Sequence, residues 1–213
     1  MQKEERFQKF IKYFSIHQPA AETELHYKSP FHLLIAVILS AQCTDTRVNA
    51  ITPPLLKKFA TPESLAKAKY SEVFEFIKSC SYPNNKSKYL VEMAKTLISH
   101  YNGIVPSDVN ELQKIPGVGR KTANVIASVV FKKPVMAVDT NVFRVSARIG
   151  LTTNAKNPLE AEKQLVKHIP DEKIPTAHHW LILHGRYICK ARKPKCFECG
   201  ISKICKYYKT LKQ

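Results

Sequence analysis

An all-helical fold is predicted for this chain, and two observations lead to it. Glycine is scarce, at six of 213 residues. Most segments repeat apolar residues three and four positions apart, which is the spacing of one face of an α-helix. Phe7, Phe10, Ile11 and Phe14 form the first such stripe. The chain has no internal repeat and no low-complexity linker, so two lobes would be joined by ordinary short loops.

Start and stop signals divide the rest of the chain into further helices. The first is the longest apolar stretch, Pro30 to Ala41, which is shorter than the roughly 18 residues of a membrane span and is predicted to be a buried helix. The candidate junctions between two lobes lie near Glu22 and Lys133. The remaining helices are expected near 45–59, 70–78, 85–101, 108–114, 119–132, 140–149, 158–168 and 176–190.

The charge of the chain predicts a polyanionic partner. Thirty-four Lys and Arg against seventeen Asp and Glu give a net charge of +17, beyond the magnitude of about 2–8 that suffices for solubility. Residues 101–213 carry +12 of this charge and residues 1–100 carry +5, so we expect the phosphate-facing surface mainly in the second half. An anionic membrane would also attract this charge, but no polybasic amphipathic helix stands out. Nucleic acid is the favoured partner, and no membrane is expected.

The N-terminal segment 1–10 mixes charges and lacks the apolar region of a secretory signal. We therefore expect a reducing compartment, the cytoplasm, with association with the nucleoid if the cell is bacterial. Cys43 and Cys80 are expected to be ordinary buried residues.

Four of the six cysteines give the strongest local signal. Cys189, Cys196, Cys199 and Cys205 follow the spacing Cys-x6-Cys-x2-Cys-x5-Cys. In a reducing compartment this pattern favours a metal site over two disulfides, because thiols stay reduced and thiolates are soft ligands. Structural zinc sites typically use two short knuckles, whereas a cubane tolerates unequal loops. The spacing therefore favours one [4Fe-4S] cluster, with zinc as the alternative.

Four cations lie in the six-residue loop between the first two of these cysteines: Lys190, Arg192, Lys193 and Lys195. This charge density suits contact with DNA phosphates. The alternative is a solvated turn whose cations offset the negative charge of a thiolate-rich cluster.

The segment 115–121, Ile-Pro-Gly-Val-Gly-Arg-Lys, lies between a short predicted helix and an amphipathic one. Gly117 and Gly119, on either side of Val118, allow backbone conformations closed to other residues and expose N–H groups beside a helix N-terminus. A Gly-x-Gly motif is weak evidence alone, and the sequence lacks the flanking strand that a dinucleotide-binding fold requires. The segment is therefore predicted to be a helix-hairpin-helix whose turn binds a DNA phosphate, with Arg120 directly after the turn.

Lys121 falls in the first turn of the second helix, where a cation opposes the helix dipole. A lysine amine in water, with a pKa of about 10.4, is neutral in roughly one molecule in 2,500 at pH 7. A helix terminus supplies at most about 2 kcal/mol, whereas desolvation shifts a pKa by up to about 3–5 units. A nucleophilic lysine would therefore need burial against bound DNA. From this motif alone, a nucleophile and a phosphate-binding cation are equally good interpretations.

An apolar run at 134–138 leads to Asp139, which is followed by Thr-Asn-Val-Phe-Arg. Asp139 is predicted to be a helix N-cap. Capping is worth about 1 kcal/mol and would by itself explain an aspartate at this position.

The hairpin lysine, the aspartate eighteen residues later and the C-terminal cysteines together resemble the endonuclease III family, which are helix-hairpin-helix DNA glycosylases and lyases. The resemblance covers essentially the whole chain. Besides the cysteine spacing, it rests on the segments 29–31, 39–42, 115–122, 138–140 and 178–186.

This resemblance implies two helical domains that flank a DNA-binding cleft. A six-helix domain with the hairpin would span 22–133, and an iron-sulfur domain would join 1–21 to 134–213. The implied function is that of a monomeric glycosylase and AP lyase of base excision repair, acting on double-stranded DNA with damaged bases or abasic sites. Lys121 would attack C1′ of an oxidised pyrimidine nucleotide, and Asp139 would assist base departure. The resulting imine would lead to cleavage 3′ to the abasic site by β-elimination.

Members of the family also fill the vacated space in the duplex, a role that falls here on Gln42 and Tyr82. Tyr82 departs from a common aliphatic wedge, although an aromatic ring stacks on a base for about 1–3 kcal/mol. Asn141 is a second departure, since histidine is common there and asparagine occurs in adenine glycosylases.

Two alternatives to this function remain. The first is an adenine-mismatch glycosylase, which is opposed by Lys121 and by the end of the chain eight residues after Cys205, where adenine glycosylases carry a further domain. The second is a non-catalytic DNA-binding iron-sulfur protein.

Overall fold

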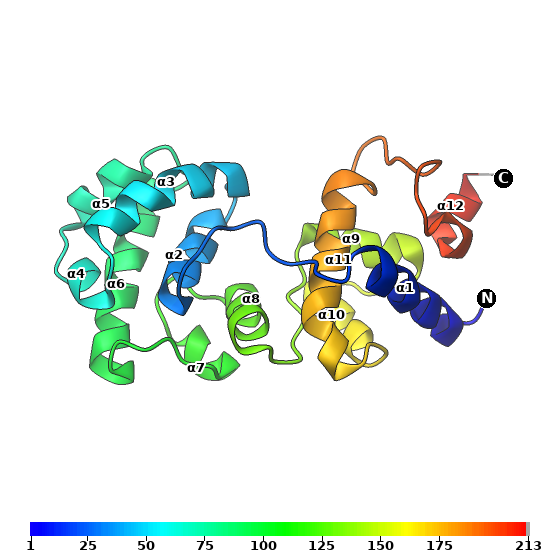
Figure 1. Cartoon of the computed structure of the whole chain (residues 1–213), viewed down its shortest axis with the longest axis horizontal. Coiled ribbons are helices and arrows are strands. Elements are labelled where there is room, and N and C mark those ends of the chain that lie inside the picture. Colours follow the sequence, from blue (N-terminus) through cyan, green and yellow to red (C-terminus); the bar gives the residue numbers. More distant parts are fainter. Residues whose placement is uncertain (212–213) are drawn as a thin grey trace. The chain divides into compact units, whose positions relative to one another are not determined.

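The computed structural model describes residues 1–211, and all regular secondary structure in that part of the chain is helical (Figure 1). The predicted all-helical fold is therefore confirmed. No helix within residues 1–211 is both long and apolar enough to cross a membrane.

The chain divides into two compact units. One unit is continuous, from Thr23 to Phe131, and the other joins Met1–Glu22 to the described residues from Lys132 onward. The domain boundaries taken from the family resemblance stay a prediction. The compact units differ from them by one residue at the first junction (23 against 22) and two at the second (131 against 133).

Helix α2 lies at the centre of the continuous unit. It packs against α3, α6 and α8, and every residue from Leu33 to Leu39 is buried. Ser29 caps the helix by accepting a hydrogen bond from the His32 N–H, and Pro30 occupies the first turn, where a missing N–H costs nothing. The predicted buried helix is confirmed. The helices of this unit are α2 (Pro30–Ser40), α3 (Asp45–Lys58), α4 (Pro62–Ala66), α5 (Tyr70–Ile77), α6 (Pro83–Tyr101), α7 (Val109–Gln113) and α8 (Arg120–Phe131).

Helix α4 has no counterpart among the predicted helices. Its five residues are too short to show a period, although Thr61 and Ser64 form a reciprocal capping box at its start. It packs with α5 against α6, the longest helix of the unit. Helix α6 begins directly after Tyr82.

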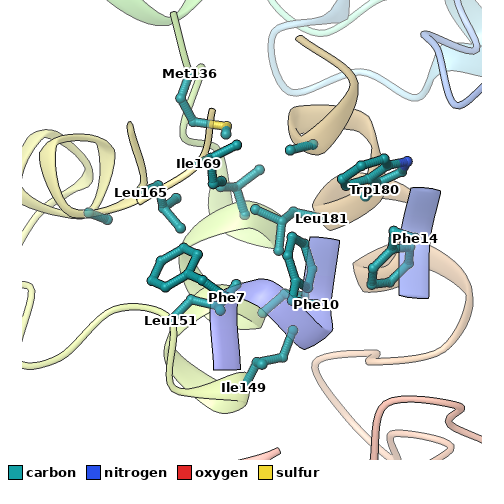
Figure 2. Packing of buried hydrophobic residues seen from close by; sticks show 14 of the residues in the cluster. Phe7, Phe10, Phe14, Met136, Ile149, Leu151, Leu165, Ile169, Trp180 and Leu181 are labelled. Carbon is teal, nitrogen blue, oxygen red and sulfur yellow. The ribbon is translucent and has the colours of Figure 1, made fainter. Parts of the chain in front are cut away.

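The discontinuous unit is closed by aromatic side chains of its first helix. Figure 2 shows Phe7, Phe10 and Phe14 of this helix reaching into one cluster with Trp180 and Leu181. The ring centroids of Phe14 and Trp180 are 5.8 Å apart and stacked, and the Trp180 Nε1–H donates to the Gln18 carbonyl at 2.7 Å. The helices of this unit are α1 (Lys3–His17), α9 (Thr140–Ile149), α10 (Pro158–Val166), η1 (Asp171–Lys173), α11 (Ile174–Tyr187), η2 (Ser202–Ile204) and α12 (Lys206–Thr210).

Helices α9 and α11 approach each other closely at Gly185. A Cβ added there would lie 2.9 Å from the Cβ of Asn141 and 3.0 Å from Cγ2 of Val145, so a larger residue would force the two helices apart. The position of the N-terminal half of α9 therefore depends on a glycine in α11.

Two histidines of α11 are buried as neutral rings. Burial lowers the pKa of His179 to about 3, and electrostatic interactions with His178, Lys132 and Arg186 act in the same direction. Burial alone lowers the pKa of His184 to about 4. Protonating either ring in the folded protein would require a buried charge.

We expect the free energy of unfolding to fall as the pH drops from 7 to 5, with about 2 kcal/mol of the loss due to His179. The folded pKa of His179 lies below the ordinary value of 6.5. Its contribution is therefore complete above pH 6.5 and is lost as the pH falls toward the folded value. Urea unfolding of the wild type and His179→Gln at both pH values tests this, because glutamine does not titrate. An equal pH dependence of the two proteins would contradict the assignment.

Candidate active site and cysteine cluster

The predicted helix, turn and helix are present at 109–131. Asp108 caps α7, since its carboxylate accepts from the N–H groups of Asn110 at 2.8 Å and Glu111 at 3.0 Å. The turn is closed by a hydrogen bond from the Val118 N–H to the Ile115 carbonyl at 3.0 Å. The buried Val118 side chain anchors the turn to the core of the unit.

Both glycines of this turn serve a geometric need. Gly117 has a φ of +81°, and a Cβ there would lie 2.9 Å from the Cβ of Tyr89. Gly119 is exposed, and nothing lies within 4 Å of the place where its Cβ would be. Within residues 1–211 the N–H groups of both glycines lack an acceptor. The turn therefore presents two free N–H donors and an uncovered backbone at Gly119. Because these groups lie at the N-terminus of α8, the arrangement suits an anion.

Lys121 is the second residue of α8 and is exposed to solvent, as is Arg120. Its amine has no hydrogen-bond or ion-pair partner among residues 1–211. The side chain is therefore free to reach a ligand bound at the turn. The burial that a nucleophilic amine needs is not provided by the unit 23–131, so it would have to come from the ligand.

Asp139 belongs to the other compact unit, where it caps α9 as predicted. Its Oδ1 accepts from the Val142 N–H at 2.7 Å. Its Oδ2 accepts from the Asn141 Nδ2 at 3.1 Å, a contact that helix capping does not require. The carboxylate is thus fixed through both oxygens while it remains half-exposed.

Asn141 connects this carboxylate to α11. Its Oδ1 accepts from the Arg144 guanidinium at 3.0 Å, and the same Arg144 nitrogen donates to the Gly185 carbonyl at 3.0 Å and the Cys189 carbonyl at 3.2 Å. Sequence reasoning missed Arg144, because an arginine in the middle of an amphipathic helix usually faces solvent.

Gln42 and Tyr82 come from turns that the fold brings together in the continuous unit. Both residues are exposed, and both have left-handed backbones, with φ of 53° and 55°. The Ser81 hydroxyl donates to the Gln42 carbonyl, which ties one turn to the other. Non-glycine residues adopt this conformation only where their surroundings hold them. We call residues 41–43 the Gln42 turn and residues 80–82 the Tyr82 turn.

Lys86 supports the Gln42 turn from inside the protein. Only 4% of this lysine is exposed, and its ammonium donates to the carbonyls of Leu39 at 2.8 Å and Ala41 at 2.7 Å. Burial lowers the pKa of Lys86. Sequence reasoning missed this residue, since nothing in its local pattern distinguishes it from a surface lysine on a helix.

The four C-terminal cysteines are free thiols that line one cavity after α11. Ile149, Ile188 and Ile201 add an apolar wall. Burial raises the pKa of Cys199 to about 11 and also raises that of Cys205. Within residues 1–211 no three His, Cys, Asp or Glu side chains converge on a position for a single metal ion. Four soft donors around a shared cavity are chemically suited to a thiolate-bound cluster.

Polar groups surround these thiols at longer range. The Arg148 guanidinium lies 3.6 Å from the Cys189 sulfur, and the His184 Nε2 lies 3.6 Å from the Cys199 sulfur. Arg148 also donates to the carbonyls of Lys190 at 2.7 Å and Ala191 at 3.0 Å. This arginine, which sequence reasoning also missed, therefore holds both the cysteine cavity and the start of the cationic loop.

The four cations of that loop, Lys190, Arg192, Lys193 and Lys195, are all exposed. Lys195 forms an ion pair with Glu198 at 3.4 Å. The exposed cations are available to a polyanion, as phosphate binding requires. The same exposure agrees with a solvated turn, so the two interpretations of this loop stay open.

Helices α7 and α8 with their glycine turn define a helix-hairpin-helix protein. In agreement with this class, residues 35–171 match the family model described as "HhH-GPD superfamily base excision DNA repair protein". The chain is 48% identical over 200 residues to Endonuclease III of Rickettsia felis, covering 94% of this chain and 93% of the relative. It is 44% identical over 189 residues to Endonuclease III of Escherichia coli, covering 89% of each chain. The chain therefore belongs to the endonuclease III family.

A solved structure supports the same conclusion. The fold is similar, with a TM-score of 0.93 and 42% identity over the whole of both chains, to a trapped endonuclease III–DNA covalent intermediate in an estranged-adenine complex. The resemblance stated from the sequence motifs is confirmed.

The two glycines of the hairpin predict different responses to alanine. Gly117→Ala should lower the free energy of unfolding by about 1–2 kcal/mol, because a left-handed alanine is strained and its Cβ would meet Tyr89. Gly119→Ala should cost less, since its φ is not positive and its surroundings are open. Urea unfolding of both variants measures the difference, and equal losses would argue against the described turn.

Proposed function

We propose that this protein removes oxidised pyrimidines from double-stranded DNA and cleaves the strand 3′ to the resulting abasic site. The general activity, that of a bifunctional DNA glycosylase and AP lyase of base excision repair, follows from membership of the endonuclease III family. Lys121 carries the proposal. Its exposed amine lies in the first turn of α8, directly after a turn suited to a phosphate.

DNA binding is assigned to two sets of groups. The free N–H groups of Gly117 and Gly119, on either side of Val118, would hold one phosphate together with Arg120. This would place the sugar of a neighbouring nucleotide near the Lys121 amine. The cationic loop would contact further phosphates, and the net charge of +17 supports a polyanionic partner. We propose that the protein acts as a monomer on chromosomal DNA in the cytoplasm.

The damaged nucleotide has to leave the base stack before its C1′ is accessible. Gln42 and Tyr82 would enter the space that it vacates. Their exposure and the hydrogen bond between their turns support this role, since backbone segments that are already held lose little conformational entropy on insertion.

The reaction begins when the unprotonated Lys121 amine attacks C1′. The bond between C1′ and the base breaks, and its electron pair leaves with the base, which takes up a proton. The nitrogen loses a proton, the C1′–O4′ bond then breaks as O4′ takes up a proton, and a protonated imine joins Lys121 to the opened sugar. The Asp139 carboxylate would stabilise the positive charge that develops on the sugar as the base departs. The imine acidifies the C2′ proton, and its removal expels the 3′ phosphate. Water then releases Lys121.

Asn141 would position Asp139 for this role through the 3.1 Å hydrogen bond. Asparagine at this position also resembles adenine glycosylases, so adenine-mismatch removal is the second candidate function. The exposed Lys121 favours the first candidate, because removal of a base by water needs no amine nucleophile.

Lys121→Ala should reduce borohydride trapping on duplex DNA containing an oxidised thymine to below about one hundredth of the wild-type rate, because no imine forms without the amine. DNA affinity should change by less than about tenfold, the effect of one lost phosphate contact. Lys114→Ala is the matched control, since this exposed hairpin lysine is paired with Glu111. Undiminished trapping by Lys121→Ala would refute the assignment, and release of a mismatched adenine without trapping would favour the second candidate.

We also propose that Cys189, Cys196, Cys199 and Cys205 hold one [4Fe-4S] cluster. When bound, the cluster would cross-link the end of α11 to the start of α12 through four iron–sulfur bonds. The Arg148 guanidinium, 3.6 Å from the Cys189 sulfur, would offset part of the negative charge of the thiolates. A closed shell of four protein ligands supports a structural role in ordering the cationic loop.

Purified protein should be brown and contain about four irons with matching acid-labile sulfide per chain. Cys199→Ser should lose colour and iron, because it removes one of the four thiolates. Cys43→Ser should keep both, because Cys43 belongs to the other compact unit. Elemental analysis and visible absorption provide the readouts, and a colourless protein with one zinc per chain would overturn the cluster assignment.

A further inference from the structure

Two thiols outside the C-terminal cluster lie next to each other in the continuous unit. The Sγ atoms of Cys43 and Cys80 are 3.6 Å apart, although 37 residues separate them in the chain. Cys80 is buried as predicted, but Cys43 is half-exposed, so the expectation that both are ordinary buried residues is wrong for Cys43. Cys43 lies in the turn after α2 and is the more exposed residue of the pair.

The thiol pair connects the two turns that carry the proposed DNA-inserting residues. Cys43 follows Gln42 directly, and Cys80 precedes Tyr82 by two residues. The hydrogen bond from Ser81 to the Gln42 carbonyl and the contacts of Lys86 with Leu39 and Ala41 hold the same two segments. Any change in the sulfur–sulfur distance therefore acts on a region with little freedom to adjust.

The two thiols differ in access and in environment. Burial raises the pKa of Cys80 to about 11, and the nearby positive charges of Lys86 and Arg47 offset only part of this effect. Cys43 is the thiol that a dissolved reagent reaches first. An attack at Cys43 leaves Cys80 within reach as the resolving thiol.

We propose that Cys43 and Cys80 are a redox modification site, which forms a reversible disulfide by exchange with a small-molecule disulfide such as glutathione disulfide. The Cys43 thiolate attacks one sulfur of the reagent, which gives a mixed disulfide and releases one glutathione thiolate. Cys80, deprotonated by solvent, then attacks the Cys43 sulfur and releases the second. Two protein thiols are oxidised and one glutathione disulfide is reduced to two glutathione thiols.

This disulfide acts on substrate turnover, a consequence that rests on the proposed function of Gln42 and Tyr82. Bond formation shortens the sulfur–sulfur distance from 3.6 Å to about 2.05 Å. Rotation of the two cysteine side chains and displacement of the two turns together absorb this movement of about 1.5 Å. Because a misplacement of about 1 Å can cost up to about a hundredfold in rate, the oxidised protein should process damaged DNA more slowly than the reduced protein.

The test uses the full chain with its cluster, kept under nitrogen and incubated with glutathione disulfide. Peptide mapping without reductant should find the peptide containing Cys43 joined to the peptide containing Cys80, while visible absorption shows that the cluster is intact. The kcat/KM on DNA with an oxidised thymine should fall about tenfold and return after treatment with dithiothreitol. Cys43→Ser and Cys80→Ser are matched controls that should show no fall, and Cys43→Ala replaces either variant that folds poorly.

Each outcome bears on a separate step. A missing cross-link between Cys43 and Cys80 overturns the modification site. An unchanged kcat/KM in fully cross-linked protein, or an equal fall in the serine variants, overturns its effect on turnover. A reduced protein that is inactive on the lesion counts against the proposed function instead, because the peptide map still decides whether the disulfide forms.

Discussion

The packing of the aromatic face of α1 against α11 is the contact on which the discontinuous unit depends. Phe10 and Phe14 lie against Trp180, and the indole N–H is bound to the carbonyl of Gln18 just after α1. Helix α11 is thereby fixed, and it carries Gly185, which sets the approach of α9, and leads directly to Cys189. The supports of the candidate aspartate and of the first cluster cysteine are therefore shared. A loss of packing at Phe14 would disturb both at once.

The continuous unit supports its candidate residues differently. There a buried ammonium, that of Lys86, lies at the C-terminal end of α2, where the helix dipole favours a cation and the last carbonyls lack partners within the helix. This arrangement satisfies a buried charge and fixes the turn that follows α2. The left-handed backbones of Gln42 and Tyr82 store strain in the region that is proposed to enter DNA, as expected at a functional site.

Most helices of the chain were predictable from the sequence, but the short helices α4 and α12 were not. Helices such as α2 and α9 have the predicted limits within a residue, because each carries a capping residue and an amphipathic or fully apolar run. The five-residue α4 and α12 do not extend over enough turns to show a period. Lys121, Asp139 and the four cysteines could be proposed as site residues from the sequence, because the proposed chemistry depends on residue type and spacing.

The supporting residues could not be identified in this way. Lys86, Arg144 and Arg148 donate to carbonyl groups that are distant in the chain. Every residue has a backbone carbonyl, so the sequence does not indicate which one accepts such a hydrogen bond. The half-exposure of Cys43 also depends on how the Gln42 turn is held, which is a tertiary property. Residue identity therefore indicates candidate chemistry for this site, but it does not indicate the contacts that position the candidate residues.

Because the discontinuous unit is built from both ends of the sequence, it is able to form only late in synthesis. Gln18 leaves the ribosome 162 residues before its partner Trp180, an interval on the order of 10–30 s at usual elongation rates. The segment 23–131 is continuous and has all its own contacts available within that time. The apolar face of α1, with Phe7, Phe10 and Phe14, has to stay uncovered until α11 is made. A nascent chain of this design therefore exposes the aromatic face of α1 early in synthesis and buries it late.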